Sequence, residues 1–226
     1  MSDRRYLRQL LAGRDFGKKD PMCQQMANFV YLVGDSVTRE CVVVDPAWDI
    51  DGIASFAEND GMKITGALIT HYHPDHCGGT FLGFKAQGIA QLLARAPCPI
   101  HVHRAEANGI QVVTGVSQKE LTLHDSGDRV KVGDVEVELL HTPGHTPGSQ
   151  CFRCGDALIS GDTLFLQGCG RVDLPGGDRE EMQRTLHTRL ATLPNDLVLY
   201  PGHNYGHKPH APLGEVKETN PVFRGR

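Results

Sequence analysis

The sequence has no apolar run long enough to cross a membrane, because none approaches the ~18 consecutive residues that a spanning helix needs. Neither charge is in strong excess, since the formal net charge is −4 and the isoelectric point is near 6.3. Nucleic-acid binding usually requires a basic face, so we expect no nucleic-acid partner. Residues 1–6 lack the apolar core and cleavage site of a secretory signal, which favours a cytoplasmic protein.

The cysteines do not follow the pattern of a disulfide framework. Their number is odd, at seven, and their spacing is scattered. Cys151 and Cys154 form one CxxC pair without a second pair, inside a predicted hairpin. The pair is either a metal or redox motif or two ordinary strand cysteines, and the second interpretation is the more frequent one.

Length and composition are those of an ordinary globular protein. The chain has 226 residues, of which 39% are hydrophobic and 22% charged, enough to bury one sizeable core. It contains no repeat period of ~20–50 residues, low-complexity segment or linker. We therefore expect a single domain over residues 1–226, as a monomer or a homodimer.

Strands and helices alternate along the chain. Hydrophobic patterns and turn residues predict strands at 30–33, 41–44, 64–70, 99–102, 129–132, 135–140, 150–153, 157–160 and 197–200. Helices are predicted at 50–59, 88–95, from residue 104 onward, and at 179–193. The tail from Lys208 is expected to be extended, with at most one helical turn. Because both halves open with strands, the pattern favours an α/β protein with two stacked sheets and helices outside.

Five histidines and two aspartates fall into four short segments, each just past a predicted strand. They are His71, His73, Asp75, His76, His145, Asp162 and His203. Loops at strand ends, held by a rigid scaffold, are where sites are usually built. Imidazole and carboxylate donors suit Zn, Fe or Mn, and the absence of thiolate from this set argues against a closed structural zinc site.

The spacing of the first segment predicts two adjacent metal positions. His71 and His73 lie two apart on extended chain and point the same way, whereas Asp75 and His76 lie in the turn beyond. The expected first set is His71, His73 and His145; the second is Asp75, His76 and His203; Asp162 bridges the two. Two divalent ions about 3.5–4 Å apart can hold a bridging hydroxide as nucleophile, which would make Asp75 and Asp162 essential for catalysis.

The remaining histidines are expected to be structural. They are His101 and His103, which form a second HxH pair, and His124, His141, His187, His207 and His210. Asp45 either orients a ligand histidine or forms a plain Asp-Pro turn. Gln24, Gln25 and Asn28 either line the mouth of the site or form a solvated segment before the first strand.

The metal segments resemble a known superfamily. Residues 70–76 (THYHPDH), 142–145 (TPGH), 160–164 (SGDTL) and 200–203 (YPGH) resemble, in order, the metal motifs of the metallo-β-lactamase superfamily. The resemblance covers about residues 28–223 and includes all seven ligand positions. It implies an αββα sandwich of two mixed β-sheets flanked by helices, but no particular substrate, because one fold hosts many reactions.

Within the superfamily the chain resembles the glyoxalase II branch, through residues 161–165, 168–171 and 201–205. The resemblance implies two divalent ions, zinc first and iron or manganese as alternatives, and a thioester substrate such as an acyl-glutathione or another thiol conjugate. It also implies that Arg171 and Tyr205 contact glutathione, although a structural salt bridge and a packed ring are the alternatives. We expect no counterpart of the additional C-terminal helical region of glyoxalase II, and residues 171–177 instead resemble short glyoxalase-II-like hydrolases.

Persulfide dioxygenases are the strongest alternative. They use a single Fe(II) held by residues matching His71, His145 and Asp162, and residues 168–173 resemble that family. Against this, Gly202 stands where those enzymes usually have alanine, and residues 174–177 are more hydrolase-like. A lactonase and a non-enzymatic metal-binding protein remain open. An exported β-lactamase and a nuclease with a basic arm fit the sequence less well.

Overall fold

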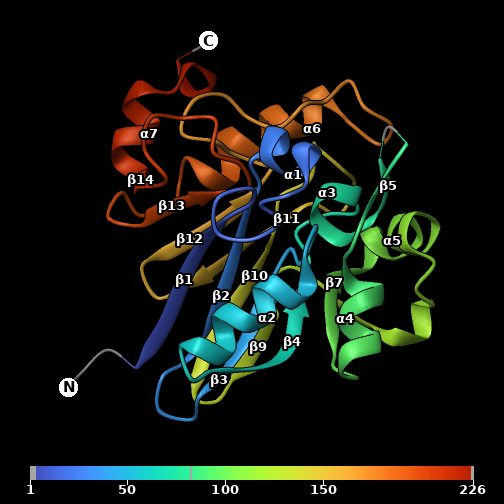
Figure 1. Cartoon of the computed structure of the whole chain (residues 1–226). Helices are drawn as coiled ribbons and strands as arrows, with labels where there is room; N and C mark the ends of the chain where they lie inside the picture. Colours follow the sequence, from blue (N-terminus) through green and yellow to red (C-terminus); the bar gives the residue numbers. More distant parts are fainter. Residues whose placement is uncertain (1–3, 82, 225–226) are drawn as a thin grey trace.

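Two mixed β-sheets of six strands each form the middle of the molecule (Figure 1). The computed structural model describes residues 4–81 and 83–224. The first sheet contains β1 (Arg5–Leu11), β2 (Phe29–Asp35), β3 (Glu40–Val44), β4 (Lys63–Leu68), β7 (Ile100–His103) and β8 (Leu121–His124), side by side in that order. β1, β2 and β3 pair antiparallel, whereas β3, β4, β7 and β8 pair parallel.

The second sheet is built from the C-terminal half of the chain. Its strands are β9 (Arg129–Val132), β10 (Val135–His141), β11 (Gln150–Cys154), β12 (Ala157–Gly161), β13 (Val198–Pro201) and β14 (Ala211–Pro212). Only β12 and β13 pair parallel among these strands; the other neighbours are antiparallel. A separate two-stranded hairpin pairs β5 (Gly79–Phe81) with β6 (Phe84–Ala86).

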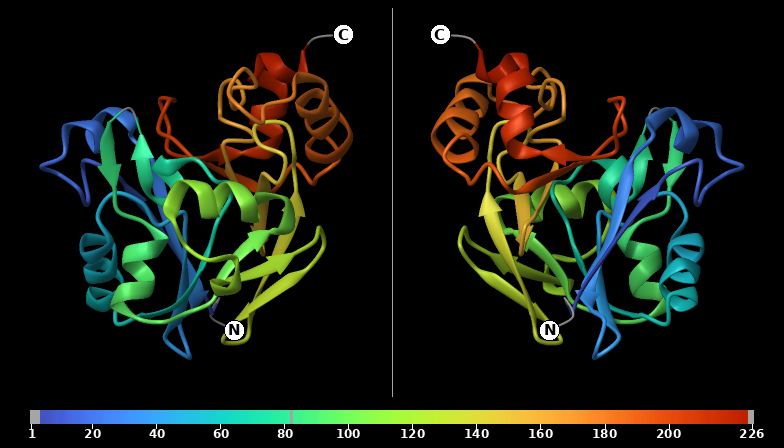
Figure 2. Two further views of the ribbon diagram at one scale, coloured as in Figure 1. Left: turned by 90° about the vertical axis from the view of Figure 1, so that its right-hand side faces the viewer. Right: turned by 90° about the vertical axis from the view of Figure 1, so that its left-hand side faces the viewer.

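Helices cover the outer face of each sheet, as Figure 2 shows from two sides. The α-helices are α1 (Pro21–Met26), α2 (Ile50–Asn59), α3 (Pro74–Cys77), α4 (Ile89–Arg95), α5 (Ala107–Thr114), α6 (Arg179–Arg184) and α7 (Leu213–Thr219). α2, α4 and α5 pack on the first sheet, and α6 and α7 pack on the second. No helix in the described ranges is both long and apolar enough to span a membrane.

Successive strand residues point into two different apolar layers, one on each face of the sheet. Because both faces are buried, the strand sequences are continuously hydrophobic. In β2, Tyr31 and Val33 point between the sheets, where they meet Phe152 of β11. Val30 and Leu32 point to the opposite face, against the helices of the first half. The αββα sandwich that the sequence predicts is therefore confirmed.

Several elements differ from the sequence-based expectation. The predicted strand at 64–70 ends at Leu68, because Thr70 turns toward Asp45. The predicted helix at 179–193 begins as α6 but continues as a π-helix over Thr185–Leu190. The tail is more regular than expected, since α7 has seven residues and buries Leu213 and Val216 on the second sheet.

The sequence did not predict β1, β8, the β5–β6 hairpin, or the short helices α1 and α3. Asp75 and His76 were expected in a turn and lie instead in α3, a single helical turn of four residues that begins with Pro74. Proline is favoured at the first position of a helix because its fixed φ is preorganised and its missing N–H would be unpaired there anyway.

Candidate metal centre

The four ligand segments meet because they follow strands whose ends lie at the same edge of the sandwich. β10 and β12 are both antiparallel to β11, and β13 is parallel to β12, so β10, β12 and β13 run in the same direction. Their C-terminal ends carry His145, Asp162 and His203, respectively. The end of β4 in the first sheet supplies residues 71–76 to the same place.

His71, His73 and His145 form the first group of donor atoms. His71 Nε2 lies 3.1 Å from His73 Nδ1 and 3.2 Å from His145 Nε2. The third side of this triangle, between His73 Nδ1 and His145 Nε2, measures 2.9 Å. Three ring nitrogens at this spacing match one triangular face of a tetrahedral ion with Zn–N distances of about 2.0–2.1 Å.

Asp75, His76 and His203 form a second triangle beside the first. His76 Nε2 and His203 Nε2 are 3.2 Å apart, and they lie 3.5 and 3.4 Å from Asp75 Oδ2. Asp162 lies between the groups, with Oδ1 3.4 Å from His76 Nε2 and Oδ2 3.6 Å from His145 Nε2. The structure thus brings together all seven residues that the sequence singled out, and a third group of donors, His71, His76 and Asp162, spans the two triangles.

Hydrogen bonds at the outer nitrogens fix how the rings face. His145 Nδ1 donates to the Arg171 carbonyl at 2.6 Å, and His203 Nδ1 donates to the Met26 carbonyl at 2.8 Å. A backbone carbonyl only accepts, so each Nδ1 carries the proton and each Nε2 keeps its lone pair. These two rings are therefore held in the tautomer that a metal ion requires.

Asp45 orients the ring of His76 directly and the ring of His71 through Thr70. Its Oδ2 lies 2.9 Å from His76 Nδ1 and accepts the Thr70 hydroxyl at 2.6 Å, while Oδ1 accepts the Thr70 backbone N–H at 2.7 Å. The Thr70 oxygen in turn lies 2.9 Å from His71 Nδ1. Of the two interpretations of Asp45, orientation of a ligand histidine is the one that the contacts support.

Burial and the mutual interactions of the histidines and carboxylates shift the pKa values of the cluster. Burial lowers the pKa of His71 well below its ordinary value and that of His73 to about 4, with further lowering by neighbouring histidines. Burial also lowers the pKa of His76, but the carboxylates around it, Asp162 first, raise it to about 10. Burial raises the pKa of Asp162, yet His203 and His76 hold it well below its usual range.

The surroundings of one Asp162 oxygen support the binding of a metal at this cluster. Asp162 Oδ1 is a buried side-chain oxygen without a hydrogen-bond partner in the described residues. Buried carboxylate oxygens are normally hydrogen-bonded or coordinate a metal. The backbone of Gly202 packs directly against this oxygen, since a Cβ at that position would overlap with it. The donor set therefore fits metal ions, and Asp162 would be one of the residues that hold them.

Glu106 supports the first group and was not found from the sequence. Its side chain is fully buried, and it accepts hydrogen bonds from Tyr72 N at 2.7 Å, the Thr146 hydroxyl at 2.8 Å and Gly148 N at 2.6 Å. Burial raises its pKa to about 7, although these three donors act in the opposite direction. Glu106 thus joins the loop of His71 and His73 to the loop of His145.

The two expected substrate contacts lie near the cluster in different settings. Tyr205 is 57% exposed and stacks on His203, with ring centroids 4.7 Å apart, and its edge meets Phe165. Arg171 follows Gly170, which packs against the backbone of Asp162. The exposed Arg171 guanidinium donates two hydrogen bonds to the Asp173 carboxylate, at 2.9 and 2.8 Å. Tyr205 is thus free to meet a ligand, whereas Arg171 is already paired.

Of the three residues before the first predicted strand, only Asn28 reaches the cluster. Gln24 and Gln25 are exposed on α1, while Asn28 is buried and contacts the second group. Its position two residues before the first predicted strand was the only sequence signal for it.

The other histidines lie outside the metal cluster. His101 bonds to His124, and His103 stacks on His141. The CxxC pair is divided between two layers, since Cys151 packs under α6 and Cys154 between the sheets. Both are ordinary strand residues, and none of the seven cysteines, all within the described ranges, forms a disulfide.

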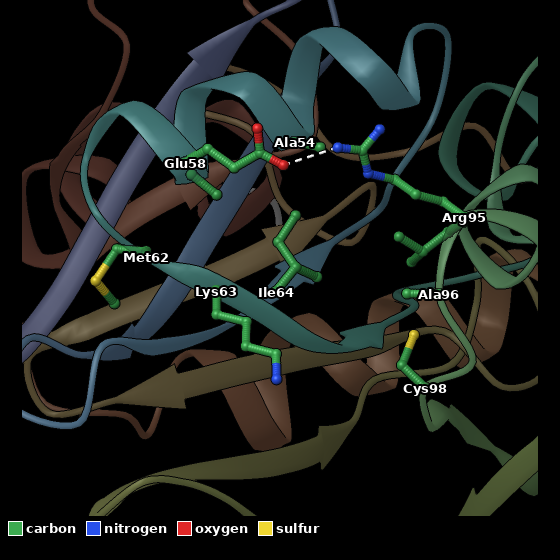
Figure 3. Close-up of a pocket in the computed structure, with 10 residues that line it drawn as sticks. Ala54, Glu58, Met62, Lys63, Ile64, Arg95, Ala96 and Cys98 are labelled. Atoms are coloured by element: carbon green, nitrogen blue, oxygen red, sulfur yellow. Dashed lines mark hydrogen bonds and ion pairs between the residues drawn. The ribbon is translucent and has the colours of Figure 1, made fainter.

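A cavity of about 260 Å³ opens between α2, β4 and α4, and Figure 3 shows its lining. None of its lining residues belongs to the ligand cluster. Its one arginine, Arg95, is paired with Asp51 and Glu58 at 2.6 and 2.7 Å. This cavity therefore adds no group to the metal centre.

A four-layer sandwich with a His/Asp cluster at its strand ends defines a metal-binding, hydrolase-like protein. The model of the metallo-beta-lactamase superfamily matches residues 25–203. The hydroxyacylglutathione hydrolase of a Polaromonas species is 40% identical over 79% of this chain and 62% of that protein, so the match spans less than two thirds of that relative. This chain belongs to the metallo-β-lactamase superfamily.

Two further similarities bear on the chemistry. The human mitochondrial persulfide dioxygenase ETHE1 is 31% identical over 85% of this chain and 70% of that protein. The solved structure of TTHA1623 in a di-iron-bound form matches with a TM-score of 0.68 at 27% identity, covering 87% of this chain and 95% of that chain. Both branches that the sequence resembles are thus represented among the relatives.

Proposed function

We propose that this protein is a metal-dependent thioester hydrolase of the glyoxalase II kind, acting on acyl-glutathione or a similar thiol conjugate. The observation that carries the proposal is the complete second ligand triangle, Asp75, His76 and His203. Its donor atoms lie 3.2, 3.5 and 3.4 Å apart, a spacing similar to that of the first triangle. The 40% identity to a hydroxyacylglutathione hydrolase supports the same choice.

In this proposal His71, His73 and His145 hold one divalent ion and Asp75, His76 and His203 hold the other, with Asp162 between them. Zinc is the expected metal, and the donor set also suits iron or manganese. A pair of such ions supplies a hydroxide nucleophile at neutral pH and charge stabilisation for the oxygen of the attacked carbonyl. The ligands come from both sheets, so we take the whole chain as one catalytic domain.

The residues of the chain position the substrate and the ligands. Tyr205, stacked on His203 and 57% exposed, would pack against the thiol conjugate. Arg171 would bind a carboxylate of the conjugate in place of Asp173, because a guanidinium fork matches either carboxylate. A thiolate is a good leaving group, so no side chain need donate a proton to it.

The test is thiol release from S-D-lactoylglutathione, using protein whose bound metal has been quantified. Rapid release with two ions per chain is the expected result. No release from this or other glutathione thioesters, with two ions bound, would refute the proposal.

A mononuclear Fe(II) persulfide dioxygenase is the second candidate, favoured by the 31% identity to human ETHE1 and by one geometric trio. His71 Nε2 and His145 Nε2 are 3.2 Å apart, and Asp162 Oδ2 is 3.6 Å from His145 Nε2. Two histidines and one carboxylate suit non-haem iron with open positions. About one iron per chain, with oxygen uptake on glutathione persulfide, would establish this alternative.

A further inference from the structure

Asn28 is locked in place beside the second ligand triangle. Its backbone forms a bridge with His203, and the next residue, Phe29, donates its N–H to the Gly202 carbonyl at 2.7 Å. On the other side, Ala12 N donates to the Asn28 carbonyl at 2.9 Å. The side chain is 1% exposed. Its position is therefore set by the main chain on both sides of it.

The amide nitrogen of Asn28 approaches all three atoms of that triangle. Nδ2 lies 3.1 Å from Asp75 Oδ2, 3.3 Å from His76 Nε2 and 3.5 Å from His203 Nε2. Nearly equal distances place it over the middle of the triangle, on one face. Of these three atoms only the carboxylate oxygen keeps a lone pair for the amide once the ring nitrogens bind an ion.

Trp48 decides which end of the amide faces the ligands. Its indole N–H donates to Asn28 Oδ1 at 2.9 Å, and an indole nitrogen can only donate. The oxygen of Asn28 therefore faces Trp48, and the NH₂ group faces Asp75. Trp48 is 6% exposed and has a φ of 77°, which is uncommon for a bulky residue and costs conformational energy. Backbone strain of this kind persists only where packing around the residue holds its conformation in place.

We infer that Asn28 is a positioning residue for the second metal position, and that Trp48 sets its orientation. By donating to Asp75 Oδ2, the amide holds this carboxylate toward His76 and His203. An NH₂ group cannot itself ligate a cation, so Asn28 closes one face of the triangle without adding a ligand. This inference rests on the proposed two-metal function.

The experiment is a zinc titration of metal-free protein that resolves two binding steps, on the wild type and on Asn28→Leu, Asn28→Ala and Trp48→Phe. Leucine fills nearly the same space without hydrogen bonds. Both Asn28 variants should lose roughly 10- to 100-fold in affinity for the second ion, with the first ion unaffected. Trp48→Phe should show a smaller loss in the same step, because the amide can then turn.

Activity provides a second readout, since excess zinc should restore thioester hydrolysis in Asn28→Leu if the residue acts on ion binding alone. Gln25→Leu, in exposed α1 nearby, is the matched control and should behave as wild type. Unchanged second-ion affinity in both Asn28 variants would overturn the inference and leave the proposed function standing. Equal losses at both positions would also overturn it, as a general structural effect. A wild type that binds only one ion would refute both.

Discussion

The carboxylate of Glu106 accepts the hydroxyl of Thr146 at 2.8 Å, one residue after His145 in the chain. The same oxygen accepts Gly148 N, and a Cβ at Gly148 would come within 2.7 Å of the Glu106 side chain. The loop that carries His145 is therefore shaped around this buried acid, while the other oxygen holds the loop of His71 through Tyr72.

Replacing Glu106 with glutamine should weaken the first metal position. Glutamine keeps one acceptor oxygen and places an NH₂ group against donors, which leaves a buried N–H or O–H unpaired at a cost of about 1–3 kcal/mol. We expect a lower free energy of unfolding and roughly 10- to 100-fold weaker binding of the first ion. Denaturant unfolding and zinc competition measure the two effects. Glu180→Gln, exposed on α6, should change neither.

Asp162→Ala should remove metal and nearly all activity, because this residue contacts both ligand groups. The loss should exceed the roughly 10- to 100-fold typical of residues that only support a ligand. Metal analysis and hydrolysis of S-D-lactoylglutathione measure it. Asp196→Ala, an exposed aspartate, is the control. An Asp162→Ala protein that kept both ions and its activity would contradict the bridging role.

Asp75→Ala distinguishes the two candidate reactions. Asp75 belongs to the second group alone, so a two-metal hydrolase should lose that ion and become nearly inactive. A dioxygenase that uses His71, His145 and Asp162 should keep its iron and most of its oxygen uptake. The metal content, thioester hydrolysis and oxygen uptake of one Asp75→Ala preparation distinguish the two reactions.

Freeing Arg171 should strengthen substrate binding if this residue recognises a carboxylate. In the structure the Arg171 guanidinium is ion-paired with Asp173. The hydrogen bonds and the positive charge of Arg171 lower the pKa of Asp173 to about 2. We expect Asp173→Asn to lower KM and Arg171→Ala to raise it, each by about two- to fivefold, as for an exposed ion pair. A thioester without a carboxylate is the control substrate. Metal content should not change, and equal KM values for all three proteins would remove Arg171 from the site.

Acid should destabilise the fold through two histidines of β7. Burial, with His124 and His141 close by, lowers the pKa of His101 and of His103 to about 4, below the ordinary 6.5. Between these values the unfolded chain binds more protons than the folded one, so the free energy of unfolding falls as pH drops from about 6.5 toward 4. A His101→Gln/His103→Gln protein should show a flatter decline in denaturant unfolding series. His207→Gln, exposed, should follow the wild type.

The ligands could be predicted because they lie in short contiguous motifs. His71, His73, Asp75 and His76 fall within six residues, and each later ligand follows a strand that is itself recognisable from its hydrophobic run. Glu106 and Asn28 could not be predicted in the same way. Each is a single polar residue, and its partners arrive from distant parts of the chain only on folding.

The sandwich was predictable where strands are buried on both faces, as in β2 and β3. β1 was missed because it lies at the edge of its sheet, where arginine and glutamine interrupt the hydrophobic pattern. β8 is also an edge strand and has only four residues. In α7, two buried residues are too few to reveal a helical period before the packing is known.

The ligand cluster draws on both sheets. Residues 71–76 follow a strand of the first sheet, and three later ligands follow strands of the second: His145, Asp162 and His203. An ion held there joins segments far apart in the sequence, much as a disulfide does in a secreted protein. Its binding energy adds to the free energy of unfolding, by about 2.7 kcal/mol at a free metal concentration of 100 Kd. In a chain whose seven cysteines form no disulfide, a metal ion at this site would serve as the cross-link, and its removal would lower the free energy of unfolding.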